Sequence, residues 1–242
     1  MPAQKIAAIS KASPRAEQLP VLSYRDFLQT KADEEGMRKG IRTGLRIRGA
    51  ACELLEGTTP DKLKIQDICT LTGIAQGTMY QYFADRDHLL ATLLQEFAAF
   101  LHDRMEASTL GSTSPEESMQ LATQMYCRLF EANKGLMKCL LHHYDAFPQA
   151  RGIVAAWNKA WIDTIVGAIR KRQRFTKGKH TGEVELRRRA YALGGMVDQY
   201  LAGIYLHGDA HLAAVAGDTR SVVRTLTFIW FKAFEEELAA VE

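Results

Sequence analysis

KLKIQDICTLTGIAQGTMYQYFADRDHLLATLL, residues 62–94, is the segment that decides the fold of this chain. Its first part carries apolar side chains at near-helical spacing, namely Leu63, Ile65, Ile68 and Leu71. Gly73 follows, and glycine tolerates the positive φ with which a helix ends at a sharp turn. We therefore predict two short helices that meet at Gly73. The second, over 76–83, is too short to be stable without neighbours, as is typical of a helix-turn-helix.

The flanking sequence supplies two longer helices. Asp85 is in the position of an N-cap, and an apolar stripe follows it at Leu89, Leu90, Leu93, Leu94 and Phe97. Upstream, a helix is predicted over 36–56. Its first half carries Arg38, Lys39, Arg42, Arg46 and Arg48 without an acid between Gly36 and Ala51. Arg42 and Arg46 share a face, and phosphate contact is favoured there over a merely solvated surface.

Residues 46–90 resemble the DNA-binding domain of the TetR (tetracycline repressor) family. The family's run around Ala-Gly-Val-Ser-x-Gly-Thr-aromatic-Tyr-x-Tyr-Phe is matched without a gap by residues that include Gly73, Gly77, Thr78, Tyr82 and Phe83. The stretch 46–55, RIRGAACELL, is similar to the family's first helix. Outside 46–90 the likeness rests on length and helical pattern.

The resemblance implies that the 76–83 helix reads a major groove of double-stranded DNA. Gln76, Thr78 and Gln81 share one side by helical spacing; glutamine pairs with adenine and the threonine methyl packs on thymine. Gly77 lets the backbone approach the DNA. Of Tyr80 and Tyr82, the family implies that one reaches phosphate and the other packs inward, without deciding which.

Three positions depart from the family pattern. Lys64 stands where the family has a hydroxyl that caps a helix and binds phosphate, so we expect Lys64 to contact phosphate and Asp61 to take over the capping. Ala75 replaces the usual Ser or Thr N-cap, a loss worth about 1 kcal/mol. Arg86 stands at the family's lysine, where a cation meets phosphate.

Composition indicates an ordinary soluble protein. The chain has 242 residues, 47% hydrophobic and 24% charged, with a net charge of +3, so a nucleic-acid site must come from local clustering. The four scattered cysteines suggest neither zinc nor disulfides, and a reducing cytoplasm is expected. No apolar run is long enough to span a membrane, and no signal peptide is indicated.

The sequence predicts an all-α fold. We expect an N-terminal extension over 1–35, partly disordered but with a short helix within 21–31, then a three-helix helix-turn-helix domain over 36–90. A helical ligand-binding and dimerisation domain follows over 91–242. Its helices are predicted over 86–105, 116–131, 135–144, 151–175, 183–207 and 219–240. The last two are apolar enough to predict pairing with a second copy as a four-helix bundle in a homodimer, although burial within one chain would also explain them.

The middle helices hold aromatic and methionine side chains that suit an apolar or aromatic small-molecule effector. The candidates are Met125, Tyr126, Phe130, Met137, Tyr144, Trp157, Trp161, Met196 and Tyr200. Each is equally explained as core. Asp198 is an acid within an apolar helical face, so it is expected either to bind a polar group of a ligand or to lie at the dimer seam.

No motif of an enzyme is present, and neither a cofactor nor a metal is expected. His142 and His143 diverge on a helix, and His207, Asp209 and His211 are more simply surface or capping residues. The resemblance to the TetR family implies a dimeric, ligand-responsive transcriptional regulator, most readily a repressor. The alternatives are a helical ligand-binding protein or enzyme that retains a helix-turn-helix-like segment, and an architectural DNA-binding protein without an effector.

Overall fold

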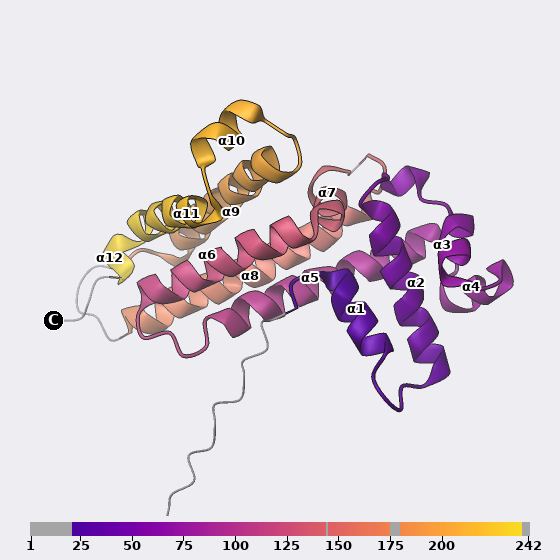
Figure 1. Cartoon of the computed structure of the whole chain (residues 1–242). Coiled ribbons are helices and arrows are strands. Elements are labelled where there is room, and N and C mark those ends of the chain that lie inside the picture. The colour runs from indigo at the N-terminus through magenta and orange to yellow at the C-terminus, as the bar shows by residue number, and fades with distance from the viewer. Residues whose placement is uncertain (1–20, 144, 175–179, 239–242) are drawn as a thin grey trace, which may run out of the picture.

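The computed structural model describes residues 21–143, 145–174 and 180–238, and within these ranges every regular element is a helix (Figure 1). The predicted all-α class is therefore confirmed. None of the described helices combines the length and hydrophobicity that crossing a bilayer requires.

The N-terminal half contains the predicted helix-turn-helix. Its elements are α1 (Tyr24–Ala32), α2 (Lys39–Leu55), a 3-10 turn η1 (Pro60–Lys62), α3 (Ile65–Thr72), α4 (Gln76–Tyr82) and α5 (Arg86–Ser108). Gly73 ends α3 with φ of 69°, and the Asp85 carboxylate caps α5 by accepting from the His88 backbone N–H. Both local predictions are confirmed. Leu71, expected to be apolar core, is instead 47% exposed.

The C-terminal half is a layered helical body that α5 enters from the helix-turn-helix (Figure 1). It comprises α6 (Pro115–Ala132), α7 (Lys134–His142), α8 (Gln149–Gln173), α9 (Glu183–Tyr205), α10 (Ala210–Ala216), α11 (Thr219–Ala233) and α12 (Glu235–Leu238). The helix predicted over 219–240 breaks at Phe234, which is fully buried and stacks on Trp230. Helix α10, capped by Asp209, was not predicted.

Helix α1 is an integral part of the core. Tyr24, Leu28 and Ala32 are buried, and the Tyr24 hydroxyl donates to Glu96 of α5, which also pairs with Arg48 of α2. The buried Asn133 side chain, between α6 and α7, accepts from the Tyr24 N–H and donates to the Leu22 and Leu129 carbonyls. Residues 21–32 are thus tied to both halves of the molecule; residues 1–20 lie outside the described part.

The four cysteines, Cys52, Cys69, Cys127 and Cys139, are all buried and unpaired. Burial raises the pKa of the Cys52, Cys127 and Cys139 thiols to about 12. These thiols are therefore protonated, unreactive core groups, because the thiolate is the nucleophile.

The two halves approach each other closely where α7 begins on the end of α2. A Cβ on Gly135 would lie 2.6 Å from the Leu55 carbonyl oxygen and 2.9 Å from the Glu56 nitrogen. The Gly135 N–H also donates to the Glu56 carboxylate at 3.3 Å. Only glycine permits this backbone approach, since a real Cβ cannot sit so close to backbone atoms.

We predict that Gly135→Ala destabilises the protein by about 1–3 kcal/mol, because the methyl group must push α7 away from α2. Gly167→Ala is the control, because Gly167 lies within α8 and its added Cβ would meet no atom within 4 Å. There, the better helix propensity of alanine should leave stability unchanged or raise it by up to about 1 kcal/mol. Equal melting temperatures for the two variants would contradict the close contact.

Candidate nucleic-acid interface

Helix α4 lies at the extreme end of the helix-turn-helix, away from the C-terminal body (Figure 1). It is anchored by Met79, which is fully buried, and by Phe83 just beyond its end. Gln76, Gly77, Tyr80 and Gln81 are exposed, and Thr78 is half-buried. A seven-residue helix that buries one side chain and offers several polar ones to solvent has the form of a reading helix.

The two tyrosines of α4 have different environments. Tyr80 is 50% exposed. The Tyr82 ring lies along α2, because a Cβ on Gly44 would be 3.5 Å from its Cδ1 and a Cβ on Gly40 would be 3.8 Å from its Oη. Tyr82 therefore packs α4 against α2, and Tyr80 is the tyrosine presented outward.

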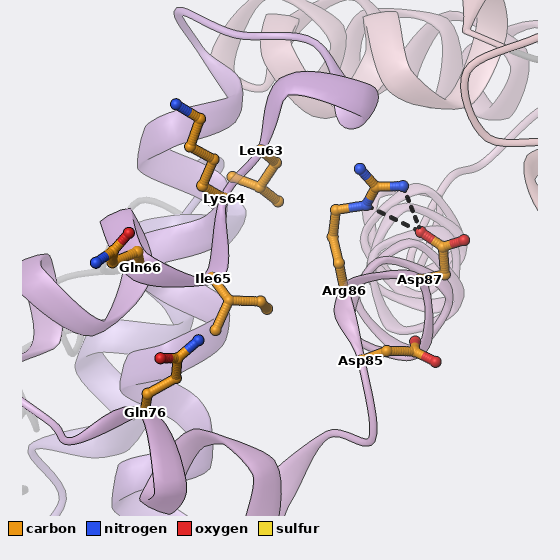
Figure 2. A pocket seen from close by; sticks show the side chains of 8 residues that line it. All are labelled: Leu63, Lys64, Ile65, Gln66, Gln76, Asp85, Arg86 and Asp87. Carbon is orange, nitrogen blue, oxygen red and sulfur yellow. Dashed lines mark hydrogen bonds and ion pairs between the residues drawn. The ribbon is translucent and has the colours of Figure 1, made fainter.

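A hollow borders α4 where the beginnings of α3 and α5 converge (Figure 2). It is lined by Leu63, Lys64, Ile65, Gln66, Gln76, Asp85, Arg86 and Asp87. Helix N-termini carry partial positive charge, and Lys64, which is exposed, adds a full one. The hollow therefore brings two cations, Lys64 and Arg86, and two carboxylates, Asp85 and Asp87, next to the first residue of α4.

Arg86 is held by the protein itself within this hollow. Its Nη1 donates to the Asp61 carbonyl at 2.9 Å, and its Nη2 lies 2.9 Å from the Asp87 carboxylate (Figure 2). The interaction with η1 fixes the start of α5 relative to α3. Any phosphate contact by Arg86 would have to use donor capacity left over from these bonds.

The expected capping by Asp61 is wrong. The start of α3 at Lys64 has no side-chain cap, and neither has the start of α4 at Ala75. The Thr59 hydroxyl near the Asp61 carboxylate instead lowers the pKa of Asp61. Asp61 lies in η1, three residues before Lys64.

Two cations of α2, Arg42 and Arg46, contact the end of α1 and the residues that follow it. Arg42 donates from Nε to the Ala32 carbonyl at 3.0 Å and from Nη2 to the Met37 carbonyl at 3.3 Å. Arg46, which is exposed, lies 3.9 Å from Asp33. Arg42 thus compensates the negative end of α1, a structural role that the sequence analysis did not consider.

Part of the predicted effector site is brought together in the C-terminal half. Tyr126 packs edge-on against Phe130 and lies 5.9 Å from Trp157 between ring centroids. Trp161 contacts His102 of α5 instead. Met125 and Met137 are buried, and Tyr144 lies outside the described residues.

Met196 and Tyr200 lie on another flank of α9 from Asp198, because residues two apart on a helix diverge by about 200°. Asp198, for which the sequence left ligand binding and the dimer seam as alternatives, faces the cluster. The Tyr126 hydroxyl donates to its Oδ1 at 2.5 Å, and burial raises the Asp198 pKa to about 6. The feature of the sequence that pointed to Asp198 was an acidic residue within the apolar face of its helix.

Among the described residues, no group of three or more His, Cys, Asp or Glu side chains is placed to hold a metal ion. His142 and His207, considered separately in the sequence, have ring centroids 5.0 Å apart.

This geometry defines a helix-turn-helix protein with a large helical body, and solved structures share it. A TetR-family transcriptional regulator from Streptomyces coelicolor matches with a TM-score of 0.63 and 14% identity, over 81% of each chain. The regulator FadR from Bacillus subtilis, in complex with stearoyl-CoA, matches with a TM-score of 0.61 and 16% identity, over 82% of this chain and 99% of that one. The superantigen PfiT matches with a TM-score of 0.59 and 12% identity, over 77% of this chain and 95% of that one.

Several further matches are TetR-family regulators as well. No protein-family model matches the sequence, and no curated protein matches it. The chain therefore has the all-helical fold of TetR-family transcriptional regulators, and these regulators are not enzymes. At such low identities the likeness establishes the fold, so function has to be derived from the site.

We predict that Ala75→Ser stabilises the protein by up to about 1 kcal/mol, because the serine hydroxyl would cap α4. Ala75 has the extended backbone of an N-cap, with φ of −70° and ψ of 147°. Ala84→Ser, at an exposed position that is not an N-cap, is the control and should change little. Thermal unfolding followed by circular dichroism measures both, and indistinguishable shifts would argue against a vacant cap at Ala75.

Proposed function

We propose that this protein is a TetR-type transcriptional regulator that binds double-stranded DNA as a homodimer and is released by a small-molecule effector, so that it acts as a repressor. The observation that carries the proposal is the presentation of α4. Gln76, Tyr80 and Gln81 are exposed on a short helix at the end of the molecule, next to Lys64. Glutamine reads adenine in the major groove, and lysine neutralises phosphate.

The roles within the interface follow from the contacts. Gln76, Gln81 and Thr78 would read base edges, with Gly77 allowing close approach. Lys64 and the outward Tyr80 would bind phosphate, with Tyr82 positioning α4 from behind. Arg86, Arg42 and Arg46 would contribute charge near the backbone while their guanidinium groups hold η1 and α1 in place.

Exposed apolar groups on α9 and α11 support dimerisation. Val184 and Tyr191 of α9 are 70% and 46% exposed, and Phe228 of α11 is 60% exposed. Large apolar side chains exposed on neighbouring elements typify an interaction surface. A two-fold pairing of these faces would place two α4 helices in successive grooves of one palindrome.

The aromatic cluster around Tyr126 supports an apolar or aromatic effector, as the stearoyl-CoA complex of the B. subtilis neighbour supports ligand binding within this fold. An effector that binds better to a dimer with wrongly spaced reading helices would release the DNA, because a ligand shifts an equilibrium only by its differential affinity.

Binding to the DNA that flanks the protein's own gene tests the proposal. We expect Gln76→Ala to weaken specific binding by about 1–3 kcal/mol, and Lys64→Ala to weaken all DNA binding and to reduce the salt slope by about 1. Fluorescence anisotropy at several salt concentrations measures both. Gln120→Ala on α6 and Lys171→Ala on α8, at exposed positions of the C-terminal body, are matched controls. Unchanged binding by the first two variants would favour a ligand-binding protein or enzyme.

We expect Phe228→Glu to convert the dimer into monomers, because it places charge in the apolar seam. Sedimentation velocity gives the mass in solution. Leu110→Glu is the control, since Leu110 is 79% exposed just after the end of α5 and belongs to neither α9 nor α11. A monomeric wild type, or a Phe228→Glu variant that stays dimeric, would rule out this seam.

A further inference from the structure

We propose that the effector is an organic cation, an apolar or aromatic molecule with an ammonium group that lies beside the carboxylate of Asp198. The effector role rests on the proposed function, whereas binding of the cation does not. The proposal extends the apolar or aromatic site by specifying the charge of its ligand.

Three helices bring polar and aromatic groups to one place. Tyr126 of α6 donates its hydroxyl proton to Asp198 Oδ1 of α9, at 2.5 Å. The Tyr126 ring is 5.9 Å from that of Trp157 on α8 and 6.0 Å from that of Phe130, measured between centroids. Phe130 in turn lies 6.1 Å from Tyr205, seven residues after Asp198 on the same helix.

The cluster lacks a positive charge. No Lys, Arg or His among the described residues forms an ion pair with Asp198, and its described hydrogen bond comes from a neutral hydroxyl. A buried carboxylate without a counter-ion is costly, and this burial raises the pKa of Asp198 to about 6. An organic ammonium group would supply the missing charge, and the surrounding aromatic faces would attract it further.

A second polar group in the cluster is also unsatisfied. Trp157 is 7% exposed, and its Nε1 is buried without a hydrogen-bond acceptor. Buried indole N–H groups usually find a partner, so this donor is available to an acceptor atom of a ligand.

The side of α9 next to the carboxylate is open in the single chain, since Asp198 and Gly194 are each only partly buried. Gly194 lies one helical turn before Asp198 on the same face of α9, and a Cβ added to it would meet no atom within 4 Å. A side chain there would occupy the region next to the carboxylate. The same carboxylate would repel anionic ligands, so a fatty acid or an acyl-CoA is disfavoured at this position.

The test is calorimetric titration of the full-length protein, without DNA, at pH 7.5. Three probes share one ring system and differ in charge: 1-naphthylmethylamine, 1-naphthylmethanol and 1-naphthoate. We expect the amine, which is protonated at this pH, to bind at least about tenfold more tightly than the alcohol, because only the amine gains the charge interaction. The naphthoate should bind most weakly.

Variants connect this preference to Asp198. Asp198→Asn keeps an acceptor for Tyr126 but removes the charge, so the amine should lose its advantage while the alcohol binds as before. Gly194→Leu should weaken both probes by filling the space. Glu96→Gln is the matched control, because Glu96 also accepts from a tyrosine hydroxyl but lies between α1, α2 and α5. Its probe affinities should equal those of the wild type.

The proposal is overturned if the amine does not bind, if the alcohol or the naphthoate binds as tightly, or if Asp198→Asn retains the preference. Thermal unfolding of each variant establishes that it is folded before titration. Since DNA is absent, failure to bind an operator would leave these results unaffected, and failure here would leave DNA binding intact.

Discussion

A single buried amide, the side chain of Asn133, joins the start of α1 to the junction of α6 and α7. It accepts a hydrogen bond from the N–H of Tyr24 and donates to the carbonyls of Leu22, before α1, and Leu129, near the end of α6. An unpaired buried polar group costs about 1–3 kcal/mol, so the arrangement resists partial separation. Glu96 of α5 adds a second link, because it accepts from the Tyr24 hydroxyl of α1 and pairs with Arg48 of α2. The helix-turn-helix is thus held to the C-terminal body through α1 as well as through the continuous helix α5.

The arginines near the helix-turn-helix also hold its elements together. Arg42 and Arg86 donate hydrogen bonds to backbone carbonyls of α1 and η1, so these positive charges stabilise the helix-turn-helix. The polar side chains that remain exposed to solvent are those of α4 and of Lys64 nearby. Affinity would then depend on steering by a modest charge and on the rigidity with which α4 is presented, because ordering a mobile helix on DNA would reduce the net binding free energy.

Local signals were sufficient to predict the reading head. Gly73 and the N-cap Asp85 act within a few residues, and their geometry follows from backbone sterics and one hydrogen bond. The sequence alone was insufficient to predict the partner of a side chain when that partner lies far away along the chain. Arg42 contacts a carbonyl ten residues away, and Tyr126 meets an acid 72 residues away. Aromatic composition indicated a possible effector site but could not separate Trp157, which joins the cluster, from Trp161, which packs on His102.

The burial of all four cysteines has a practical consequence for spectroscopy. With thiol pKa values near 12 for three of them and all four side chains buried, maleimide reagents will modify a newly introduced surface cysteine in preference to the native ones. Spin labels or fluorophores can therefore be attached to the wild-type background without removing core sulfur atoms. If the chain pairs as proposed, distances between two labelled subunits would report how far apart their α4 helices lie before and after a small molecule is added.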